Sequence, residues 1–218
     1  MEADEKQLRL ILISPEKDFP EEQGLVMEMF RMGLTQYHVR KPKYSTEKLR
    51  RYLSKFDVRY HNRIIIHTHH ELAASFQLKG IHLTERHRKK HKFFNWFMLK
   101  YLKYKRPDLQ ISTSFHVVNS LRHYNPLYRY VFLNPIFESI SKLGHKSSFN
   151  ESILRESIAK SKYKIIALGG ISVDKLEEVV NFGFYGFGLL GIVWQGNDPI
   201  AEYKKVLDKC KELNITVC

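Results

Sequence analysis

KIIALGGI at residues 164–171 and YGFGLLGIV at residues 185–193 are two continuous apolar runs, each with glycine near its carboxyl end. Such runs are typical of strands buried on both faces of a parallel sheet. Residues 172–182 between them carry apolar side chains at helical spacing behind Ser172, a predicted N-cap. The unit is therefore strand, glycine turn, helix, strand, glycine turn. Two successive glycine turns of this kind predict the phosphate-binding end of a (β/α)8 barrel.

The same alternation extends back through the rest of the chain. Further strands are predicted at residues 8–14, 36–40, 64–68, 80–84, 109–115 and 130–136. Further helices are predicted at residues 19–32, 45–53, 71–77, 93–105, 117–124, 150–159 and 199–213. Eight strands alternating with helices are what a closed barrel requires. We therefore predict an α/β fold, a single (β/α)8 TIM barrel, as one domain over residues 1–218.

Composition narrows the class of protein further. The chain has 218 residues, 43% of them hydrophobic, which is enough for one large core. No apolar run reaches the length of a bilayer, and the first residues, MEADEKQ, do not resemble a secretory signal. The two cysteines, Cys210 and Cys218, form neither a disulfide framework nor a zinc set, so we expect a cytoplasmic protein. A net charge of +13 favours anionic partners.

Polar residues and glycines gather where the predicted strands end, which is the end at which barrels of this type bind ligands. In chain order they are His38, Arg40, Lys41, His67, Thr68, His69, His70, His82, Thr84, Glu85, His87, Ser112, Ser114, His116, Asn134, Ser139, Ser141, Lys142, Gly169, Gly170, Gly188 and Gly191. Cations, hydroxyls and glycine amides dominate this set. They suit a ligand that carries phosphate, because cations pair with phosphate oxygens and glycine lets backbone N–H groups approach them.

These residues fall in motifs that occur in a fixed order: YHVR (37–40), IIIHTHHELA (64–73), KGIHL (79–83), STSFH (112–116), NPIFESISK (134–142), ALGGI (167–171) and GFGLLGI (186–192). In this order and spacing they resemble the thiamine-phosphate synthases and their sister group, the thiazole tautomerases. The resemblance spans nearly the whole chain. It implies a transferase of thiamine biosynthesis that joins a hydroxymethylpyrimidine diphosphate to a thiazole phosphate and releases pyrophosphate.

The resemblance also implies roles for individual residues. Arg40, Ser114 and Lys142 would act at the diphosphate and the pyrimidine. The expected substrate-binding set is His38, Lys41, His67, Ser139, Ser141, Gly169, Gly170, Leu190 and Gly191. Mg²⁺ is the cofactor that the family implies. The two aspartates that bind it in the family are replaced here by Thr68 and His87, which leaves Glu85 as the nearby hard oxygen ligand and predicts no metal ligands at the family positions.

Other functions stay open at this point. A thiazole tautomerase needs a proton shuttle, which in this chain would come from His116, His67 or His69, because Pro135 stands at the place of that group's catalytic histidine. A non-catalytic binder of a thiamine-related phosphate would follow from loss of the magnesium ligands. We expect small phosphorylated substrates and no membrane association, with a homo-oligomer compatible with the sequence.

Two clusters of residues, one rich in histidine and one basic, have a structural as well as a functional interpretation. The histidines among residues 67–70, with His82 and Glu85, offer nitrogen ligands for a transition metal, but spacing fixes no third ligand, and we interpret them as polar filling of the barrel. The basic run RHRKKHK at residues 86–92 could contact RNA. We interpret it instead as a solvated loop and the start of an amphipathic helix.

Overall fold

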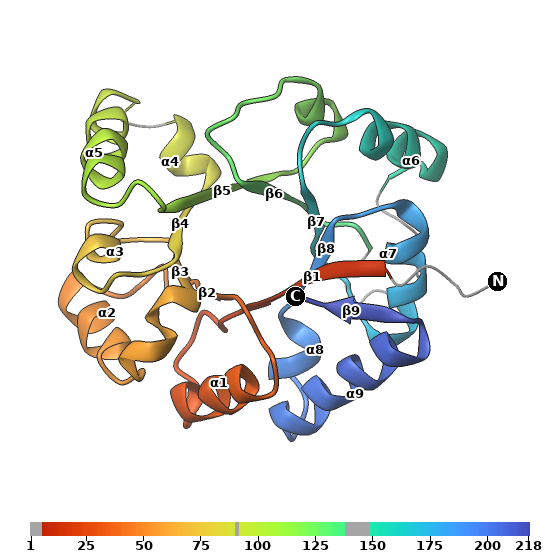
Figure 1. Ribbon diagram of the computed structural model, residues 1–218, viewed down its shortest axis with the longest axis horizontal. Helices are drawn as coiled ribbons and strands as arrows, with labels where there is room; N and C mark the ends of the chain where they lie inside the picture. The colour runs from red at the N-terminus through yellow and green to blue at the C-terminus, as the bar shows by residue number, and fades with distance from the viewer. Residues whose placement is uncertain (1–5, 90–91, 138–148) are drawn as a thin grey trace.

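The computed structural model describes residues 6–89, 92–137 and 149–218. Within them, nine parallel strands follow the order β2-β3-β4-β5-β6-β7-β8-β1-β9, and β1 pairs with β2 as well. The pairing of β1 with β2 closes eight of the strands into a ring, which Figure 1 shows end on with the helices outside it. The predicted (β/α)8 TIM barrel is therefore confirmed.

The elements lie close to the predicted positions. The strands are Lys6–Ile13 (β1), Tyr37–Val39 (β2), Ile64–Ile66 (β3), Gly80–Leu83 (β4), Gln110–Phe115 (β5), Tyr130–Leu133 (β6), Ile165–Ala167 (β7), Gly186–Leu189 (β8) and Ile215–Val217 (β9). The α-helices are Glu22–Arg31 (α1), Thr46–Leu53 (α2), Leu72–Ser75 (α3), Glu85–Lys89 (α4), Lys92–Lys105 (α5), Glu151–Lys160 (α6), Leu176–Phe182 (α7), Gly191–Trp194 (α8) and Pro199–Glu212 (α9). Short 3-10 helices cover Val58–Arg63, Val118–Arg122 and Val173–Lys175.

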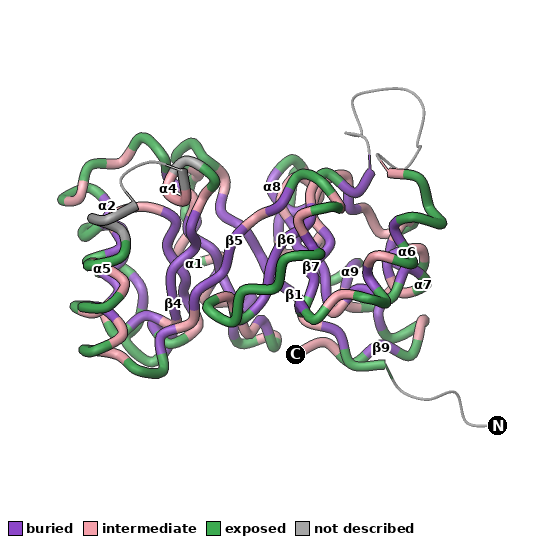
Figure 2. Tube along the Cα trace, turned by 90° about the horizontal axis from the view of Figure 1, so that it is seen from above, coloured by how far each residue is buried: buried purple, intermediate pink, exposed green. Residues whose placement is uncertain are grey.

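Alternation along each strand divides the buried side chains into two sets. Successive residues of a strand point to opposite faces, so one set fills the barrel and the other packs beneath the helices. The inner apolar set is small: Ile11, Ile13, Ile65, Tyr130, Phe132 and Ile166. The outer set is much larger and joins the sheet to its helical layer. Figure 2 shows this arrangement as buried strands surrounded by helices whose outer faces are exposed.

Local signals explain several helix starts. Ser45 accepts a hydrogen bond from the backbone N–H of Lys48 at 3.2 Å and so caps α2. Asp198 caps α9 in the same way, and Pro199 occupies the first turn, where a missing N–H is tolerated. Ser172 does not cap α7, because a 3-10 turn separates the two.

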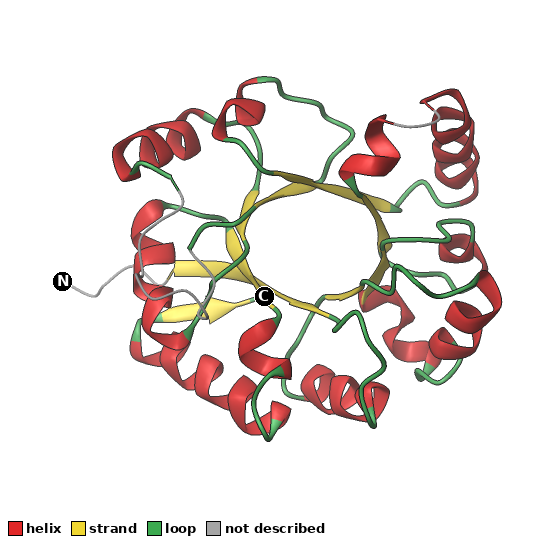
Figure 3. Cartoon of the chain, turned by 180° about the vertical axis from the view of Figure 1, so that it is seen from behind, coloured by secondary structure: helices red, strands yellow, loops and turns green. Residues whose placement is uncertain are grey.

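One strand lies outside the predicted pattern. β9 pairs with the first residues of β1, Lys6 to Leu8, while the rest of β1 pairs with β8 and β2. Figure 3 shows β9 beside this part of β1, outside the ring. In the described part of the chain, no helix is both long enough and apolar enough to cross a membrane.

Candidate active site

A cavity of about 800 Å³ opens at the carboxyl ends of the barrel strands. All eight barrel strands contribute to it, directly or through the loop that follows them. Its described lining residues are Ile13, Arg40, His67, His82, Thr84, Glu85, Ser114, His116, Phe132, Asn134, Pro135, Phe137, Leu168, Gly169, Gly170, Ile171, Gly188, Leu190, Gly191, Ile192 and Gln195. A volume of this size lies within the range of about 300–1,000 Å³ that small-molecule sites occupy.

Histidine side chains form part of the cavity floor. Strand alternation points His38 and His82 into the barrel, and His67 continues β3 in the same direction. The rings of His67 and His82 stack with their centroids 4.2 Å apart. His38, which we expected to bind substrate, is fully buried one layer below His67 and is not among the lining residues.

Hydrogen bonds connect these histidines to their neighbours. His38 Nδ1 lies 2.9 Å from His67 Nε2, and His38 Nε2 lies 2.7 Å from the Tyr130 hydroxyl. His82 Nδ1 lies 2.9 Å from Ser112 Oγ, and its Nε2 lies 3.1 Å from Ser114 Oγ. The floor is therefore a connected polar network inside an apolar barrel, and this network orients the Ser114 hydroxyl.

The network is uncharged at neutral pH. Burial lowers the pKa of His82 to about 3, and nearby cations, including Arg88 and Arg40, act in the same direction. Burial also lowers the pKa of both His38 and His67 well below 6.5, as do the neighbouring imidazoles. These rings therefore accept or donate hydrogen bonds as neutral groups, and the cations at the cavity lie elsewhere.

Arg40 is the cation that the structure places at the rim. Its backbone N–H donates to Ser14 Oγ at 2.8 Å, which ties the end of β2 to the end of β1. Its guanidinium forms an ion pair with Glu16, and both side chains are about half exposed. An anion in the cavity can therefore reach Arg40 without any rearrangement of the barrel.

The glycine turn after β7 supplies a close backbone surface. Gly169 and Gly170 have φ values of 88° and 68°, which side chains other than glycine rarely adopt. A Cβ on Gly169 would lie 2.8 Å from Pro135 Cα, so the backbones after β6 and β7 are in contact here. Leu190 and Gly191 line the same side of the cavity after β8. The four residues predicted from the two glycine turns thus lie together at one wall.

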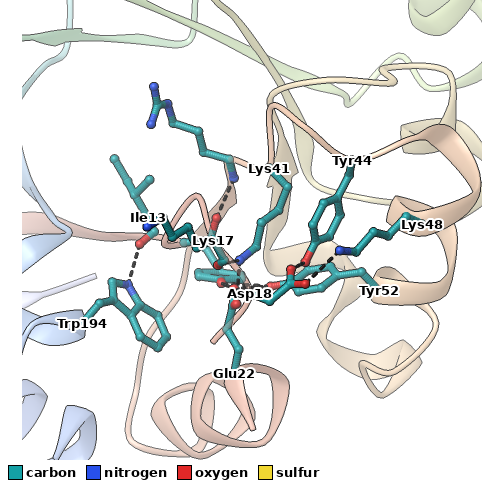
Figure 4. Close-up of polar contacts among 12 residues, drawn as sticks. Ile13, Lys17, Asp18, Glu22, Lys41, Tyr44, Lys48, Tyr52 and Trp194 are labelled. Carbon is teal, nitrogen blue, oxygen red and sulfur yellow. Dashed lines mark hydrogen bonds and ion pairs between the residues drawn. The ribbon is translucent and has the colours of Figure 1, made fainter. Parts of the chain in front are cut away.

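Lys41 is not brought to this cavity. Its side chain is fully buried on the outer side of the barrel, where Nζ contacts Glu22 Oε2 at 2.7 Å and donates to the Lys17 carbonyl at 2.8 Å. Figure 4 shows Lys41 directed at Glu22 of α1. The expected substrate-binding role of Lys41 is corrected by this placement, because a buried ammonium that is already paired with a carboxylate faces no ligand.

The positions at which the resemblance implies magnesium do not fit that ion. Thr68 Oγ1 is buried and has no hydrogen-bond partner among the described residues, and His87 Nδ1 lies 2.8 Å from Thr84 Oγ1. Glu85 is the single carboxylate among the described residues that line the cavity. Magnesium prefers oxygen ligands, whereas nitrogen donors dominate this floor.

Three predicted residues, Ser139, Ser141 and Lys142, lie outside the described residues. Of the basic run at residues 86–92, residues 90 and 91 lie outside them too. Arg88 lies on a helix, α4, and not in a loop, and it donates to the Ser114 carbonyl at 2.9 Å.

His82, Phe132 and Gln195 line the cavity, but none of the three was predicted to bind substrate. The inward direction of the His82 side chain could have been predicted from the sequence, because Gly80 and His82 occupy alternate positions of one buried strand.

Sequence comparison relates this chain to the thiamine monophosphate synthases. The family model for thiamine monophosphate synthase (TMP-TENI) matches residues 10–190. A thiamine-phosphate synthase of Limosilactobacillus fermentum is 25% identical over 63% of this chain and 62% of its own length, so the match spans under two thirds of that relative. One of Pediococcus pentosaceus is 22% identical over 83% of this chain and 84% of its own length.

Solved structures of thiamine phosphate pyrophosphorylases have the same fold as this chain. A thiamine phosphate pyrophosphorylase of Bacteroides thetaiotaomicron has a TM-score of 0.74 and 30% identity, and the match covers 94% of this chain and 98% of that one. The corresponding protein of Pyrococcus furiosus also has a TM-score of 0.74 over 94% of this chain and 96% of its own, at 17% identity, and supports the fold alone.

Proposed function

The chain belongs to the thiamine monophosphate synthase family, and from this membership we propose that it couples a hydroxymethylpyrimidine diphosphate to a thiazole phosphate. One observation carries the proposal: a single cavity receives Arg40, Ser114 and the glycine turns after β7 and β8. A cation and a hydroxyl suit one anionic substrate, and backbone amides at glycine suit the phosphate of the second.

In the proposed reaction, the bond between the pyrimidine methylene carbon and the diphosphate oxygen breaks, and its electron pair leaves with the diphosphate. The thiazole nitrogen donates its lone pair to that methylene carbon and forms the new carbon–nitrogen bond. Negative charge develops on the departing oxygen, so a cation fixed beside it stabilises the transition state. We assign this role to Arg40 and, from the sequence alone, to Lys142.

The remaining proposed roles follow from position. We assign Ser114 Oγ, which His82 orients, to the pyrimidine and the leaving group. His67 lines the cavity floor, and we assign it a contact with the substrates there. The thiazole phosphate is assigned to the turns of Gly169, Gly170, Leu190 and Gly191, with Ser139 and Ser141 added from the sequence.

Members of this family generally use Mg²⁺, which would neutralise the diphosphate when bound. Because the described residues offer it one carboxylate, Glu85, we assign it no step. We also propose that the reaction takes place in the cytoplasm, since the chain has two free cysteines and its substrates are small phosphorylated metabolites.

The test is direct coupling. The purified chain is incubated with both substrates, with Mg²⁺ or with EDTA, and thiamine phosphate and pyrophosphate are measured by chromatography. Equal amounts of the two products, and none when either substrate is omitted, would support the proposal.

Two other outcomes would overturn it. Isomerisation of a thiazole carboxylate phosphate without pyrimidine would identify a tautomerase. Thermal stabilisation by the substrates with no turnover under either condition would identify a binding protein.

A further inference from the structure

Three imidazoles from three neighbouring strands converge below the cavity. One ring nitrogen from each of His38, His67 and His82 lies within 4.8 Å of the others, and all three side chains are buried. His38 Nδ1 and His67 Nε2 are already 2.9 Å apart. Nitrogens that share one metal ion lie about 3 Å apart, since each bond to the metal is about 2.0–2.1 Å long. A modest contraction of the cluster would therefore bring all three within reach of one ion.

Contacts outside the cluster hold the second nitrogen of two of the three rings. Tyr130 holds His38 Nε2, which leaves Nδ1 directed at His67. Ser112 holds His82 Nδ1, and His82 Nε2 lies on the cavity side, 3.1 Å from Ser114 Oγ, a contact that it would exchange for the ion. Histidines that bind metals in proteins are characteristically held through their second nitrogen in this way. The arrangement is thus ordered before any ion arrives.

The chemistry of the site also selects the class of ion. Imidazole nitrogen suits zinc, cobalt, nickel, copper and ferrous iron, whereas magnesium prefers oxygen. A histidine binds a metal in its neutral form, and burial keeps these three neutral at physiological pH. His67 and His82 line the cavity, so an ion held by three nitrogens would keep an open position toward it.

We propose that His38, His67 and His82 bind one divalent transition metal ion, of the zinc and cobalt class, with its open coordination position facing the cavity. The fourth ligand is an anion or water from the cavity. That this anion is a substrate phosphate rests on the proposed function, whereas the metal site itself does not.

The test uses the purified full chain, stripped with EDTA and dialysed free of the chelator. Co²⁺ is added stepwise, and the visible absorption of the ion is recorded as a direct report on nitrogen coordination. We expect saturation at one Co²⁺ per chain and displacement of the signal by one equivalent of Zn²⁺. Zn²⁺ should also raise the thermal unfolding temperature, because an ion that binds only the folded chain stabilises it.

Three variants identify the ligands. His38→Gln and His67→Asn keep a hydrogen-bonding amide but remove an imidazole, and each should weaken Co²⁺ binding by at least about 100-fold, the upper figure for loss of a mere supporting contact. His116→Asn is the matched control, since His116 lines the same cavity but contacts the Asn134 carbonyl and lies outside the cluster. It should bind Co²⁺ as the unmodified chain does.

A milder change tests the supporting contacts. Ser112→Ala removes the hydroxyl that holds His82 and leaves all three imidazoles in place. We expect a loss of about 10- to 100-fold in Co²⁺ affinity. Circular dichroism confirms that each variant is folded, and Ser112→Ala provides the answer if a histidine variant is not.

The proposal is overturned if the unmodified chain takes up no Co²⁺ with a nitrogen-type spectrum. It is also overturned if His38→Gln, His67→Asn and His116→Asn bind alike, because that result would place the ion on surface histidines. Neither readout depends on turnover. Failure of the coupling assay with a positive Co²⁺ titration would therefore refute the proposed function alone.

Discussion

At the scale of single residues, the site depends on neutral imidazoles in a place where charge is excluded. Four of the buried histidines, His38, His67, His70 and His82, have a lowered pKa, and burial is the first cause of each shift. His70 and His82 fall to about 4 and about 3. Keeping the rings neutral leaves Arg40 as the cation that the described cavity lining offers to an anion.

These pKa values predict acid sensitivity of the metal-free chain. In the unfolded chain each histidine takes up a proton near its ordinary pKa of 6.5. In the folded chain the pKa of His70 is about 4 and that of His82 about 3, and burial also holds the pKa of His38 and of His67 well below 6.5. The unfolded state therefore binds more protons between these limits. The free energy of unfolding should be highest above pH 6.5. As the pH falls below 6.5, it should decrease by about 1.4 kcal/mol per pH unit for each histidine.

Urea unfolding in EDTA at several pH values between 7.5 and 4.5 measures this slope. His67→Asn should lower the slope by the contribution of one proton, because it removes one of the buried imidazoles. A free energy that stays level between pH 6.5 and 4.5 would contradict the assignment.

Arg40 gives a second prediction at this scale. Arg40→Ala should lower kcat/KM for coupling by about 10²- to 10³-fold, the loss typical when one preorganised group facing developing charge is removed. Steady-state kinetics with both substrates measure it. Arg59→Ala is the matched control, since Arg59 is exposed, pairs with Asp57 and lies outside the cavity lining. Equal kinetics for the two variants would remove Arg40 from the mechanism.

At the scale of elements, the sequence predicted the order and type of the barrel elements well and their ends less well. Strand β6 was expected to reach residue 136 but ends at Leu133, because the next residues include Pro135, which has no N–H for a sheet ladder. Of the helix expected at residues 117–124, the structure has a short 3-10 helix, Val118–Arg122, and not an α-helix. β9 was missed because three residues, Ile215–Val217, are too short for a periodic signal.

The glycine turn after β7 gives a prediction at this scale. Gly169→Ala should destabilise the chain by about 1–3 kcal/mol, because the φ of 88° is strained for alanine and its Cβ would clash with Pro135. Gly24→Ala is the matched control: Gly24 lies in α1 with no atom near its absent Cβ, so alanine should stabilise by about 0.5–1 kcal/mol. Urea unfolding measures both. Equal effects from the two substitutions would argue against the described turn.

The contact between β2 and α1 gives a second prediction about stability at this scale. Glu22 accepts hydrogen bonds from Lys41, Tyr37 and Tyr52, and both members of the Glu22–Lys41 ion pair are buried. Lys41→Met should cost about 3–5 kcal/mol, because it leaves a buried carboxylate without its cation. Adding Glu22→Gln should recover part of that loss. Denaturant unfolding of the single and double variants measures it, and strictly additive losses would contradict the pairing.

At the scale of the whole molecule, the barrel and the place of its cavity followed from alternation and glycine turns, since the closed fold leaves few other arrangements for eight such units. The participation of His38 in the floor network could not be predicted. The sequence places His38, His67 and His82 on three separate strands, and it is the parallel register of those strands that brings the rings into contact. Lys41 shows the opposite case, because neighbours in sequence, Arg40 and Lys41, point to opposite faces.

The net charge of +13 predicts a salt effect on the whole molecule. A cationic field raises the rate at which an anionic diphosphate arrives, and salt screens that field over about 10 Å at 0.1 M. We expect kcat/KM for the diphosphate to fall as NaCl rises from 0.05 to about 0.5 M, with little change in kcat. Kinetics at fixed pH measure both values. A kcat/KM that is insensitive to salt would show that this charge does not guide the substrate.

The ion pair between Arg40 and Glu16 bears on which molecules the cavity admits. Any anion that binds the guanidinium competes with a carboxylate of the same chain, which contacts its Nη1 group at the entrance. A ligand with one negative charge offers no more than the carboxylate it displaces, whereas a diphosphate offers several. The entrance therefore favours molecules with several negative charges, whatever the structure of their rings.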